Sequence, residues 1–402
     1  MTSRKATDLI HHPYVPPSGF AAPQVGVYKA STVIFPSVAA IRARDWRTKA
    51  GYTYGLHGTP TTFQLEERIA TLEGGKHCLL VPSGLASIAC VNLALLRAGD
   101  EVLLPDNVYA PSKTMAEGEL THWGIKHQLY DAMDPADLQR KLSDRTKLVW
   151  VEAPGSVTME FPPLAHLIHL CRQRGITTAL DNTWGAGLAF NGFDLGTGAR
   201  FTPGSGADIV VHALTKYPSG GGDVLMGSVV TRDDKLHEQL KLSHMRLGWG
   251  VGANDVEAVL RSLPSLVARY RAQDLSARQL ATWVLGRTEV AVVLHPALAG
   301  SPGHEHWRAL CGQDGLAAGL FSIVLHERYP SARVDAFCEA LALFKLGYSW
   351  GGPVSLVVPY DVRAMRPSGR WIHQGTLVRF SIGFEETDAL QADLEQALRT
   401  LG

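Results

Sequence analysis

Short apolar runs alternate with helix-like segments between residues 78 and 230. The strand-like runs are 78–81, 101–104, 147–151, 176–180, 208–211 and 224–230. The helix-like segments between them are 85–97, 112–120, 135–142 and 163–174. Strands that alternate with helices are joined by right-handed crossovers and form a mostly parallel sheet with helices on both faces. The pattern therefore predicts an α/β fold whose ligands bind beyond the carboxyl ends of the strands.

The residues before this alternation differ in composition and pattern. Residues 1–57 are rich in proline, glycine and aromatic residues and have weak periodicity, so we expect an arm that packs on a neighbouring subunit. Thr61 is followed three residues later by Gln64, a capping-box pattern that predicts the start of a first helix. The glycine pair at 74–75 predicts where that helix ends.

The residues after the alternation predict a second, smaller unit. A long helical stretch after Gly252 is interrupted at Pro264 and links the two units. Beyond residue 290 the pattern is α+β, with strands near 318–325 and 376–382 and helices near 333–343 and 387–400. The predicted organisation is an arm over 1–57, a larger domain over 58–253 and a C-terminal α+β domain over 254–402.

Composition excludes several classes of function. Lysine plus arginine equals aspartate plus glutamate at 38 each, so no overall positive field would attract nucleic acid or an anionic membrane. The first twenty residues lack the apolar core of a signal peptide, and no apolar run is long enough to cross a bilayer. Five scattered cysteines predict reduced thiols in a soluble cytoplasmic protein. The run at 303–306 lacks the spacing of a chelating helix, so we expect a turn and no metal site.

Four features at the predicted strand ends suit one cofactor. Lys216 stands between an apolar strand and the glycines at 220–222, which we expect to leave room around it, and Asp181 directly follows another strand. The turn at Gly84 leads into a helix whose free N–H groups suit a phosphate, and Tyr109 could stack on a ring. Pyridoxal 5′-phosphate needs this combination of a lysine, a carboxylate, a phosphate turn and a stacking ring.

The chain resembles the fold-type I, pyridoxal-phosphate-dependent enzymes of cysteine and methionine metabolism. The resemblance extends from about residue 52 to the C-terminus, and no single motif carries it alone. The matching runs are YGLHGTPTTFQLE, LEGG, DNVYAPS, EAPGSVTME, DNTWGAG, ALTKY, HPALAGSPGHEHW, YSWGGPVSL and LVRFSIGFE. The resemblance implies a seven-stranded, mostly parallel sheet between helices, a smaller C-terminal α+β domain and a homo-oligomer built as a dimer of dimers.

The resemblance also implies how the cofactor is held. Lys216 would bind it covalently, Asp181 would pair with the pyridine nitrogen and Tyr109 would stack on the ring. Ser156 would lie near the cofactor hydroxyl. The implied phosphate contacts are the backbone at Gly84 and Leu85, the Thr215 hydroxyl, and Tyr54 reaching from a neighbouring subunit.

The implied substrate is a small amino-acid thioether. Arg379 would bind its α-carboxylate, for which a guanidinium fork is the fitting shape. Ser349 and Trp350 would line the same side, and Tyr54 would lie close to the substrate as well. Lys216 would act as the base, with Tyr109 assisting proton transfer.

The chain departs from the family pattern around the phosphate. Leu56 stands where relatives carry an arginine, with His57 beside it as a substitute, and Ala213 stands where several relatives carry a serine. Loss of a charge-assisted contact costs about 1.5–3 kcal/mol. We therefore expect weaker cofactor retention than a complete phosphate cup would provide.

Within the family the densest resemblance is to the bacterial cystathionine β-lyases. Trp350 after Ser349 and the turn at 153–159 both favour elimination at the β-carbon. A cystathionine γ-lyase, a γ-synthase or a methionine γ-lyase shares the same core residues and is the alternative. A non-catalytic binding protein on this scaffold is a more remote one, which intact Lys216, Asp181 and Arg379 oppose.

Overall fold

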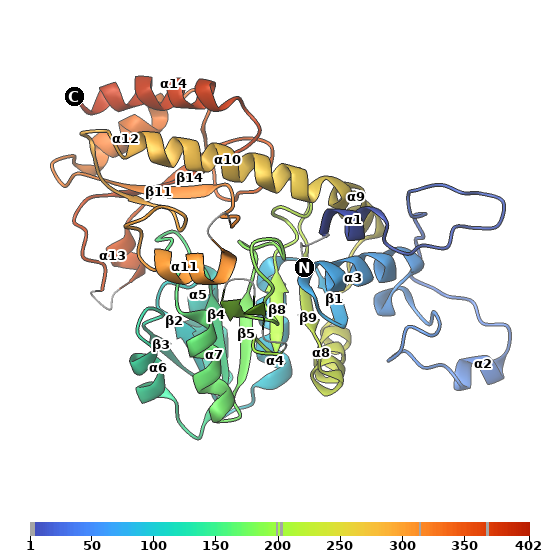
Figure 1. The fold of residues 1–402 in the computed structure, drawn as a ribbon. Coiled ribbons are helices and arrows are strands. Elements are labelled where there is room, and N and C mark those ends of the chain that lie inside the picture. The colour runs from blue at the N-terminus through green and yellow to red at the C-terminus, as the bar shows by residue number, and fades with distance from the viewer. Residues whose placement is uncertain (1–4, 198–199, 202–203, 313–314, 367–369) are drawn as a thin grey trace.

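The computed structural model describes residues 5–197, 200–201, 204–312, 315–366 and 370–402, so residues 1–4 of the predicted arm lie outside it. It contains two large sheets and a short hairpin. In Figure 1 the C-terminal unit lies above the larger sheet, and the N-terminal arm extends away to one side. Among the described residues, no helix combines the length and the apolar character needed to cross a membrane.

The larger sheet has seven strands and is mostly parallel, as predicted. In spatial order they are β1 (His77–Val81), β9 (Gly227–Thr231), β8 (Ile209–His212), β5 (Thr177–Asp181), β4 (Thr146–Glu152), β2 (Glu101–Pro105) and β3 (Lys126–Tyr130). Strand β9 is antiparallel to both of its neighbours, and every other adjacent pair is parallel. A hairpin of β6 (Gly196–Thr197) and β7 (Arg200–Phe201) follows β5.

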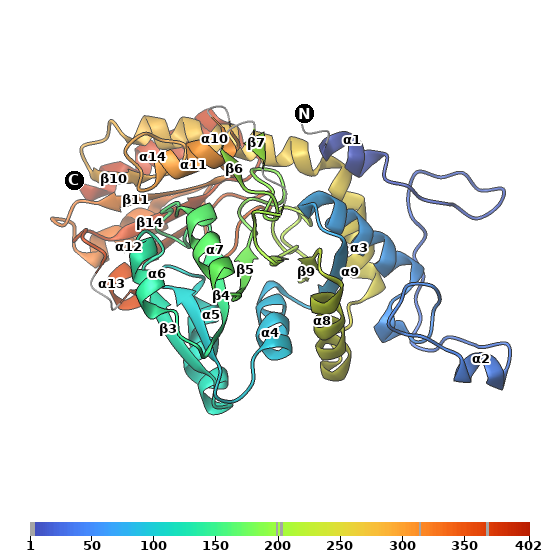
Figure 2. The same ribbon diagram turned by 60° about the horizontal axis from the view of Figure 1, so that its bottom comes forward.

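Helices cover both faces of this sheet, which explains why its central strands are apolar throughout. One face packs against α3 (Pro60–Glu73), α6 (Pro135–Lys141), α7 (Leu164–Gln173) and α9 (Ala253–Ser262). The other packs against α4 (Gly84–Leu95), α5 (Ala110–Met115), the π-helical turn η2 (Ala116–Leu120) and α8 (Asp234–Leu247). Figures 1 and 2 show these helices around the strands.

The sequence analysis did not predict strand β3, and the structure shows why. Strand β3 is one of the two edge strands. Four of the five residues of the other edge strand, β1, are buried, whereas of the five residues of β3 only Tyr130 is buried. Its sequence, KHQLY, is therefore mostly polar and lacks the apolar run by which the other strands were recognised. Because so few of its side chains are buried, hydrophobic patterning carries little information about β3.

Helix α3, which the sequence predicted as the first helix, begins earlier than its pattern suggested, and the structure has two short helices, α1 (Lys5–Ile10) and α2 (Val38–Arg42), before it. Thr59, not Thr61, is the N-cap: its side chain accepts from the Thr62 N–H at 3.3 Å, and its own N–H donates to the Thr62 hydroxyl at 2.6 Å. Pro60 explains the difference, because proline suits the first helical position. Thr61 instead donates to the carbonyl of Gly26 at 2.9 Å and so ties the arm to the helix. Gly74 ends the helix in a left-handed conformation, as expected.

The C-terminal unit is the predicted α+β assembly. A 3-10 turn, η3 (Leu263–Ser265), contains Pro264 and separates α9 from α10 (Leu266–Val284). The second sheet has the order β10 (Val290–Leu294), β11 (Leu320–Leu325), β14 (Leu377–Ser381), β13 (Leu356–Tyr360) and β12 (Lys345–Leu346). Its helices are α10, α11 (His304–Cys311), α12 (Ser331–Ala340), α13 (Val362–Met365) and α14 (Thr387–Leu398), with η4 (Arg399–Leu401) after them. The turn predicted at 303–306 is wrong, since α11 begins at His304.

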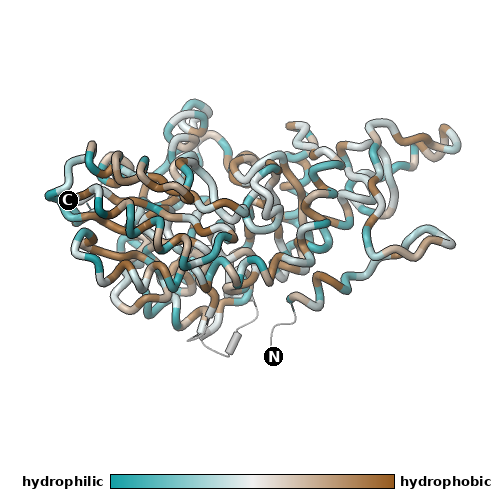
Figure 3. The backbone as a smooth tube through the Cα atoms, turned by 90° about the horizontal axis from the view of Figure 1, so that it is seen from above, coloured by the Kyte–Doolittle hydropathy of each residue, from teal (hydrophilic) through white to brown (hydrophobic). Residues whose placement is uncertain are grey.

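Several apolar residues of the N-terminal arm lie outside the hydrophobic cores of the chain. It contains α1 (Lys5–Ile10), α2 (Val38–Arg42) and the turn η1 (Gly55–His57). Leu9 of α1 is buried in the chain's own core, whereas Val15 and Ile34 are 91% and 90% exposed. Figure 3 shows hydrophobic segments running through both folded units and also along the protruding arm.

Candidate active site

Five of the predicted site residues follow strands that end at one edge of the large sheet. Strand β9 alone runs in the opposite direction, so β1, β2, β4, β5 and β8 all point their carboxyl ends the same way. The residues at or just beyond those ends are Gly84, Tyr109, Ser156, Asp181 and Lys216. Chain direction therefore gathers residues that are up to 132 positions apart in the sequence, from Gly84 to Lys216.

Lys216 lies at the contact between the two folded units. Its Nζ donates a hydrogen bond to the Ser349 Oγ at 2.9 Å and lies 5.4 Å from the centroid of the Trp350 ring. Burial and the nearby positive charge of Arg379 lower the pKa of Lys216 to about 8, and Asp181 acts in the opposite direction. An amine with that pKa is partly neutral near physiological pH and can accept a proton.

Arg379 is held beside this lysine by the backbone of Ser349. Its Nη2 donates to the Ser349 carbonyl at 3.3 Å, and its guanidinium lies 5.4 Å from the Tyr360 ring centroid. Ser349 has a φ of 107°, a strained conformation for a residue with a side chain. The Nε of Arg379 is buried without a hydrogen-bond partner. A buried, unused donor on a guanidinium is what a carboxylate ligand would satisfy.

Asp181 is fixed in place by Thr183, a residue that the sequence analysis did not single out. Its Oδ1 accepts hydrogen bonds from the Thr183 N–H at 3.0 Å and the Thr183 hydroxyl at 2.5 Å. The same hydroxyl accepts from the Ala213 N–H at 2.9 Å, which joins the ends of β5 and β8. Burial raises the pKa of Asp181, and the Thr183 hydrogen bonds oppose that rise. An Asp-x-Thr run is a local turn signal that could have been recognised.

Tyr109 and Ser156 meet at a second buried carboxylate, Glu152. The Tyr109 N–H donates to its Oε2 at 3.0 Å, and the Ser156 hydroxyl donates to its Oε1 at 2.6 Å. Glu152 pairs with Asp181 across adjacent strands. Burial and Asp181 together raise the pKa of Glu152 to about 8, against the hydrogen bonds from Ser156 and Tyr109. Like Asp181, Glu152 ends a buried strand, a signal that was present in the sequence but not used.

The turn at Gly84 has the features of an anion site, whereas Thr215 is already engaged. Gly84 and Leu85 are the first residues of α4, where N–H groups have no intrahelical acceptor. A Cβ on Gly84 would lie 2.5 Å from that of Ala213, so glycine is needed for this approach. The Thr215 hydroxyl donates to the Met226 carbonyl at 3.1 Å and accepts from its N–H at 3.0 Å.

Of the three glycines after Lys216, Gly220 has a role that the sequence did not predict. A Cβ on Gly220 would meet the guanidinium of Arg269 at 2.0 Å, and that guanidinium donates to the Tyr217 carbonyl at 2.7 Å. The glycine that closely approaches Lys216 is Gly351, whose Cβ would lie 3.1 Å from the Lys216 carbonyl carbon. The space beside the Lys216 backbone therefore depends on a glycine of the C-terminal unit.

Tyr54 and its neighbours lie on the arm. The Tyr54 side chain is about half exposed, and its ring centroid lies 5.9 Å from that of His57. The Nδ1 of His57 is hydrogen-bonded to the Thr53 hydroxyl at 2.6 Å, and the Leu56 side chain lies close to Gly250. A role for Tyr54 at the site of a second subunit stays a prediction.

The lowered pKa of Lys216 predicts a specific labelling pattern. In the cofactor-free protein, acetylation of Lys216 should become half-maximal near pH 8, well below the value of about 10.4 for an ordinary lysine. Arg379→Met removes a nearby positive charge and should move that midpoint upward. Peptide mass spectrometry of pulse-labelled protein measures both. Arg363→Met, on the exposed part of α13, is the control; an equal shift there would contradict the assigned cause.

Comparisons with known proteins identify the family of the chain. Residues 6–399 match the Cys/Met metabolism PLP-dependent enzyme family. The cystathionine beta-lyase of Bordetella avium is 36% identical over 409 residues, covering 99% of this chain and 98% of that protein. The L-alanine/L-glutamate racemase of Wolbachia pipientis wMel is 30% identical over 391 residues, covering 93% and 92% respectively. The crystal structure of metB from Corynebacterium glutamicum has a TM-score of 0.85 at 27% identity, covering 100% of this chain and 99% of that one. The chain belongs to the pyridoxal-phosphate-dependent enzymes of cysteine and methionine metabolism.

Proposed function

We propose that this enzyme is a carbon–sulfur β-lyase that converts L-cystathionine and water into L-homocysteine, pyruvate and ammonia. The observation that carries the proposal is the convergence of Lys216, Arg379 and Trp350 at the contact between the two folded units. The identity of 36% with the cystathionine beta-lyase of Bordetella avium over nearly its whole length supports the same reaction.

The side chains at the strand ends fit pyridoxal phosphate. The free N–H groups of Gly84 and Leu85 at the start of α4 suit its phosphate, and Asp181 provides a fixed anion for its ring nitrogen. Lys216 supplies a buried amine of lowered pKa for its carbonyl carbon. When bound, the cofactor supplies an electron-accepting ring that makes the substrate Cα–H acidic.

The remaining steps follow from this chain's own groups. Arg379 would bind the substrate α-carboxylate through its unused donors and so orient the Cα–H bond. The neutral form of Lys216, whose amine is hydrogen-bonded to Ser349, would remove that proton and later deliver a proton to the departing sulfur. Trp350, packed edge-on against Tyr217, would form the wall beside the reacting carbons and exclude water.

Product analysis tests the proposal. The purified, cofactor-supplemented protein is incubated with L-cystathionine, and the products are identified by mass spectrometry. Pyruvate with homocysteine supports the proposal. 2-Oxobutyrate with cysteine would assign γ-elimination instead and show that Trp350 does not select the β-carbon.

A second candidate is a racemase, since one relative with 30% identity carries that name. Racemisation uses the same removal of the Cα proton but returns it to carbon and leaves the carbon–sulfur bond intact. Incubation of L-alanine and L-glutamate in D2O, followed by chiral chromatography, detects it. Deuterated D-amino acid with no keto acid would replace the lyase proposal.

We infer that a second copy of this chain covers the arm. Val15, Phe20 and Ile34 are strongly exposed apolar residues on a segment that extends from the folded units (Figure 1). A dimer or a dimer of dimers would bury them and bring Tyr54 toward a neighbouring site. Light scattering should give a multiple of the 43.5 kDa chain mass, and Ile34→Asp should reduce it. A monomeric wild-type protein would refute the inference.

A further inference from the structure

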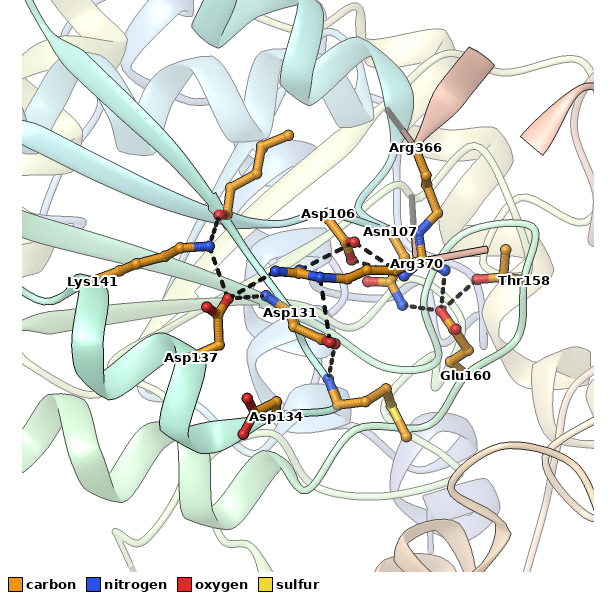
Figure 4. Close-up of polar contacts among 12 residues, drawn as sticks. Asp106, Asn107, Asp131, Asp134, Asp137, Lys141, Thr158, Glu160, Arg366 and Arg370 are labelled. Atoms are coloured by element: carbon orange, nitrogen blue, oxygen red, sulfur yellow. Dashed lines mark hydrogen bonds and ion pairs between the residues drawn. The ribbon is translucent and has the colours of Figure 1, made fainter. Parts of the chain in front are cut away.

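Arg366, at the end of α13, bridges two carboxylates of the large domain, the buried Asp106 and the partly buried Glu160 (Figure 4). Its Nη2 lies 3.0 and 3.1 Å from the two carboxylate oxygens of Asp106, and its Nη1 lies 2.7 Å from the Glu160 Oε2. The side chains of Arg366 and Asp106 are 4% and 1% exposed. Burial alone would lower the pKa of Arg366, yet the charges of Glu160 and Asp106 raise it. The guanidinium is therefore a permanent, almost fully buried cation.

One of its partners belongs to the loop that carries Tyr109. Asp106 begins that loop, three residues before Tyr109. Lys113, four residues after Tyr109, donates from its Nζ both to the Asp106 carbonyl at 2.5 Å and to the Met365 carbonyl at 2.7 Å. The loop is thus tied to the end of α13 both before and after the tyrosine.

The other partner belongs to the turn that carries Ser156. The Glu160 Oε2 also accepts from the Asn107 side chain at 2.8 Å and from the Thr158 hydroxyl at 2.9 Å. The Ser156 N–H donates to the Asn107 carbonyl at 2.9 Å. Arg366 therefore binds both loops, the first through Asp106 and the second through Glu160, and adds to the direct hydrogen bonds that Asn107 makes between them.

The segment that leads to Arg366 begins beside Arg379. Strand β13 ends at Tyr360, and α13 begins two residues later. Tyr360 pairs with Leu377 of β14, the strand that contains Arg379, and its ring lies against the Arg379 guanidinium. A short, continuous segment therefore joins the residue proposed to bind the substrate carboxylate to the cation that fixes the Tyr109 loop.

Arg370 adds an outer layer to the same network. Its guanidinium lies within 3.3 Å of Asp106, 3.5 Å of Asp131 and 3.2 Å of Asp137, and its side chain is 29% exposed. Solvent screens these contacts more than the buried pairs of Arg366. The rigid part of the connection is thus Arg366 with Asp106 and Glu160.

We propose that Arg366 is a positioning residue that sets the distance between Tyr109 on the large domain and Arg379 on the C-terminal domain. It touches neither substrate nor cofactor and acts through Asp106 and Glu160. The inference rests on the proposed roles of Tyr109 and Arg379. If the contacts of Arg366 with Asp106 and Glu160 are weakened, Tyr109 should move out of position while Arg379, on the central strand β14, stays in place.

The test compares Arg366→Met, Arg366→Lys and Asp106→Asn with Arg363→Met, an exposed arginine on the same helix. We expect Arg366→Met to lower kcat by about 10- to 100-fold with less than about a threefold change in KM, since a small misplacement of a catalytic group costs rate and spares binding. Arg366→Lys should recover part of the loss as a point charge. Asp106→Asn should resemble Arg366→Met, and the double variant should be no worse than either. Arg363→Met should match the wild type.

Hydrogen–deuterium exchange of the holoenzyme gives a readout that needs no substrate. Peptides over 106–115 should exchange at least about threefold faster in Arg366→Met, while peptides over β14 stay unchanged. A folded Arg366→Met protein with wild-type kcat and wild-type exchange would overturn the proposal. A rise in KM alone, or equal acceleration over β14, would also overturn it, because either would indicate a general structural role. If the wild type does not cleave cystathionine but the exchange pattern holds, the proposed substrate fails and the positioning role stands.

Discussion

Lys216→Ala should lower kcat/KM for the proposed elimination by at least about 10³-fold. General acid–base catalysis by a positioned group is typically worth about 10²–10⁴-fold, and this lysine would supply both the removal of the Cα proton and the delivery of a proton to the departing sulfur. The structure offers no second amine at that place among the described residues: the Nζ of Lys216 is bonded to Ser349 and enclosed by Trp350 and Arg379. Steady-state kinetics with cystathionine measure the loss.

Lys216→Arg is the matched control, because it keeps a long cationic side chain without a usable base. An arginine stays protonated at any working pH, so we expect it to be as inactive as alanine. Added small primary amines should restore part of the rate in Lys216→Ala and none in Lys216→Arg, whose side chain fills the site. Borohydride treatment of the wild-type holoenzyme should fix the cofactor on the Lys216 peptide. A variant that retains a tenth of wild-type activity would refute the assignment.

Asp181→Asn should lower kcat/KM by roughly 10²–10³-fold, or about 3–4 kcal/mol at 1.36 kcal/mol per tenfold. Asparagine keeps the shape and an oxygen that accepts from Thr183, so the change removes charge and little else. Without a fixed anion the ring nitrogen of the cofactor loses its proton more readily and accepts electrons less well. A pH titration of the bound cofactor's absorbance, beside the kinetics, measures this directly.

Asp208→Asn is the matched control within the same pair of strands. Asp208 accepts from the Thr178 N–H at 2.7 Å and the Thr178 hydroxyl at 2.9 Å, the same pattern as Asp181 with Thr183. It lies at the start of β8, at the opposite edge of the sheet from the site. Activity should therefore survive Asp208→Asn. Equal losses in the two variants would mean that sheet stability, and not charge at the cofactor, explains the effect.

The same substitution should stabilise the protein without its cofactor. Burial raises the pKa of Asp181, so the folded state favours the protonated form. As pH rises from the ordinary aspartate value through the raised one, the folded protein loses stability because it must bury a charge. Asp181→Asn avoids that loss, so its Tm should exceed that of the wild type at neutral pH and approach it in acid. Lower stability at neutral pH would contradict the burial argument.

In the large sheet, the sequence predicted the strands wherever apolar patterning is strong. The central strands of the large sheet are buried on both faces, and that burial requires the apolar runs by which they were recognised. Edge strand β3 is mostly polar and both residues of β12 are exposed, so neither has an apolar run. Strands β10 (VAVVL) and β13 (LVVPY) do have apolar runs, and the sequence analysis still did not predict them. The start of the first helix was displaced by two residues because Pro60 outweighs the cap signal at Thr61.

The candidate site likewise contains residues that the sequence predicted and residues that it did not. Lys216, Asp181 and Gly84 were predictable because each follows a strand, and chain direction alone places them at one edge. Thr183 and Glu152 carried local signals that were not used. Ser349 was predicted near the substrate, but its hydrogen bond to Lys216 was not, and Arg366 was not predicted at all. Their partners are 133 and 260 positions away, so no local pattern indicates these contacts.

The sequence by itself determined the sheet, the helices that cover it and the group of residues at its carboxyl edge, because hydrophobic periodicity and strand direction are local properties. Only the tertiary structure decided what those residues touch. The C-terminal unit supplies the oxygen on Lys216, the charge that contributes to the lowered pKa of that lysine, the glycine beside its backbone and the cation behind Tyr109. Burial and electrostatic energies depend on distances between atoms, and those distances exist only once the two units have packed together.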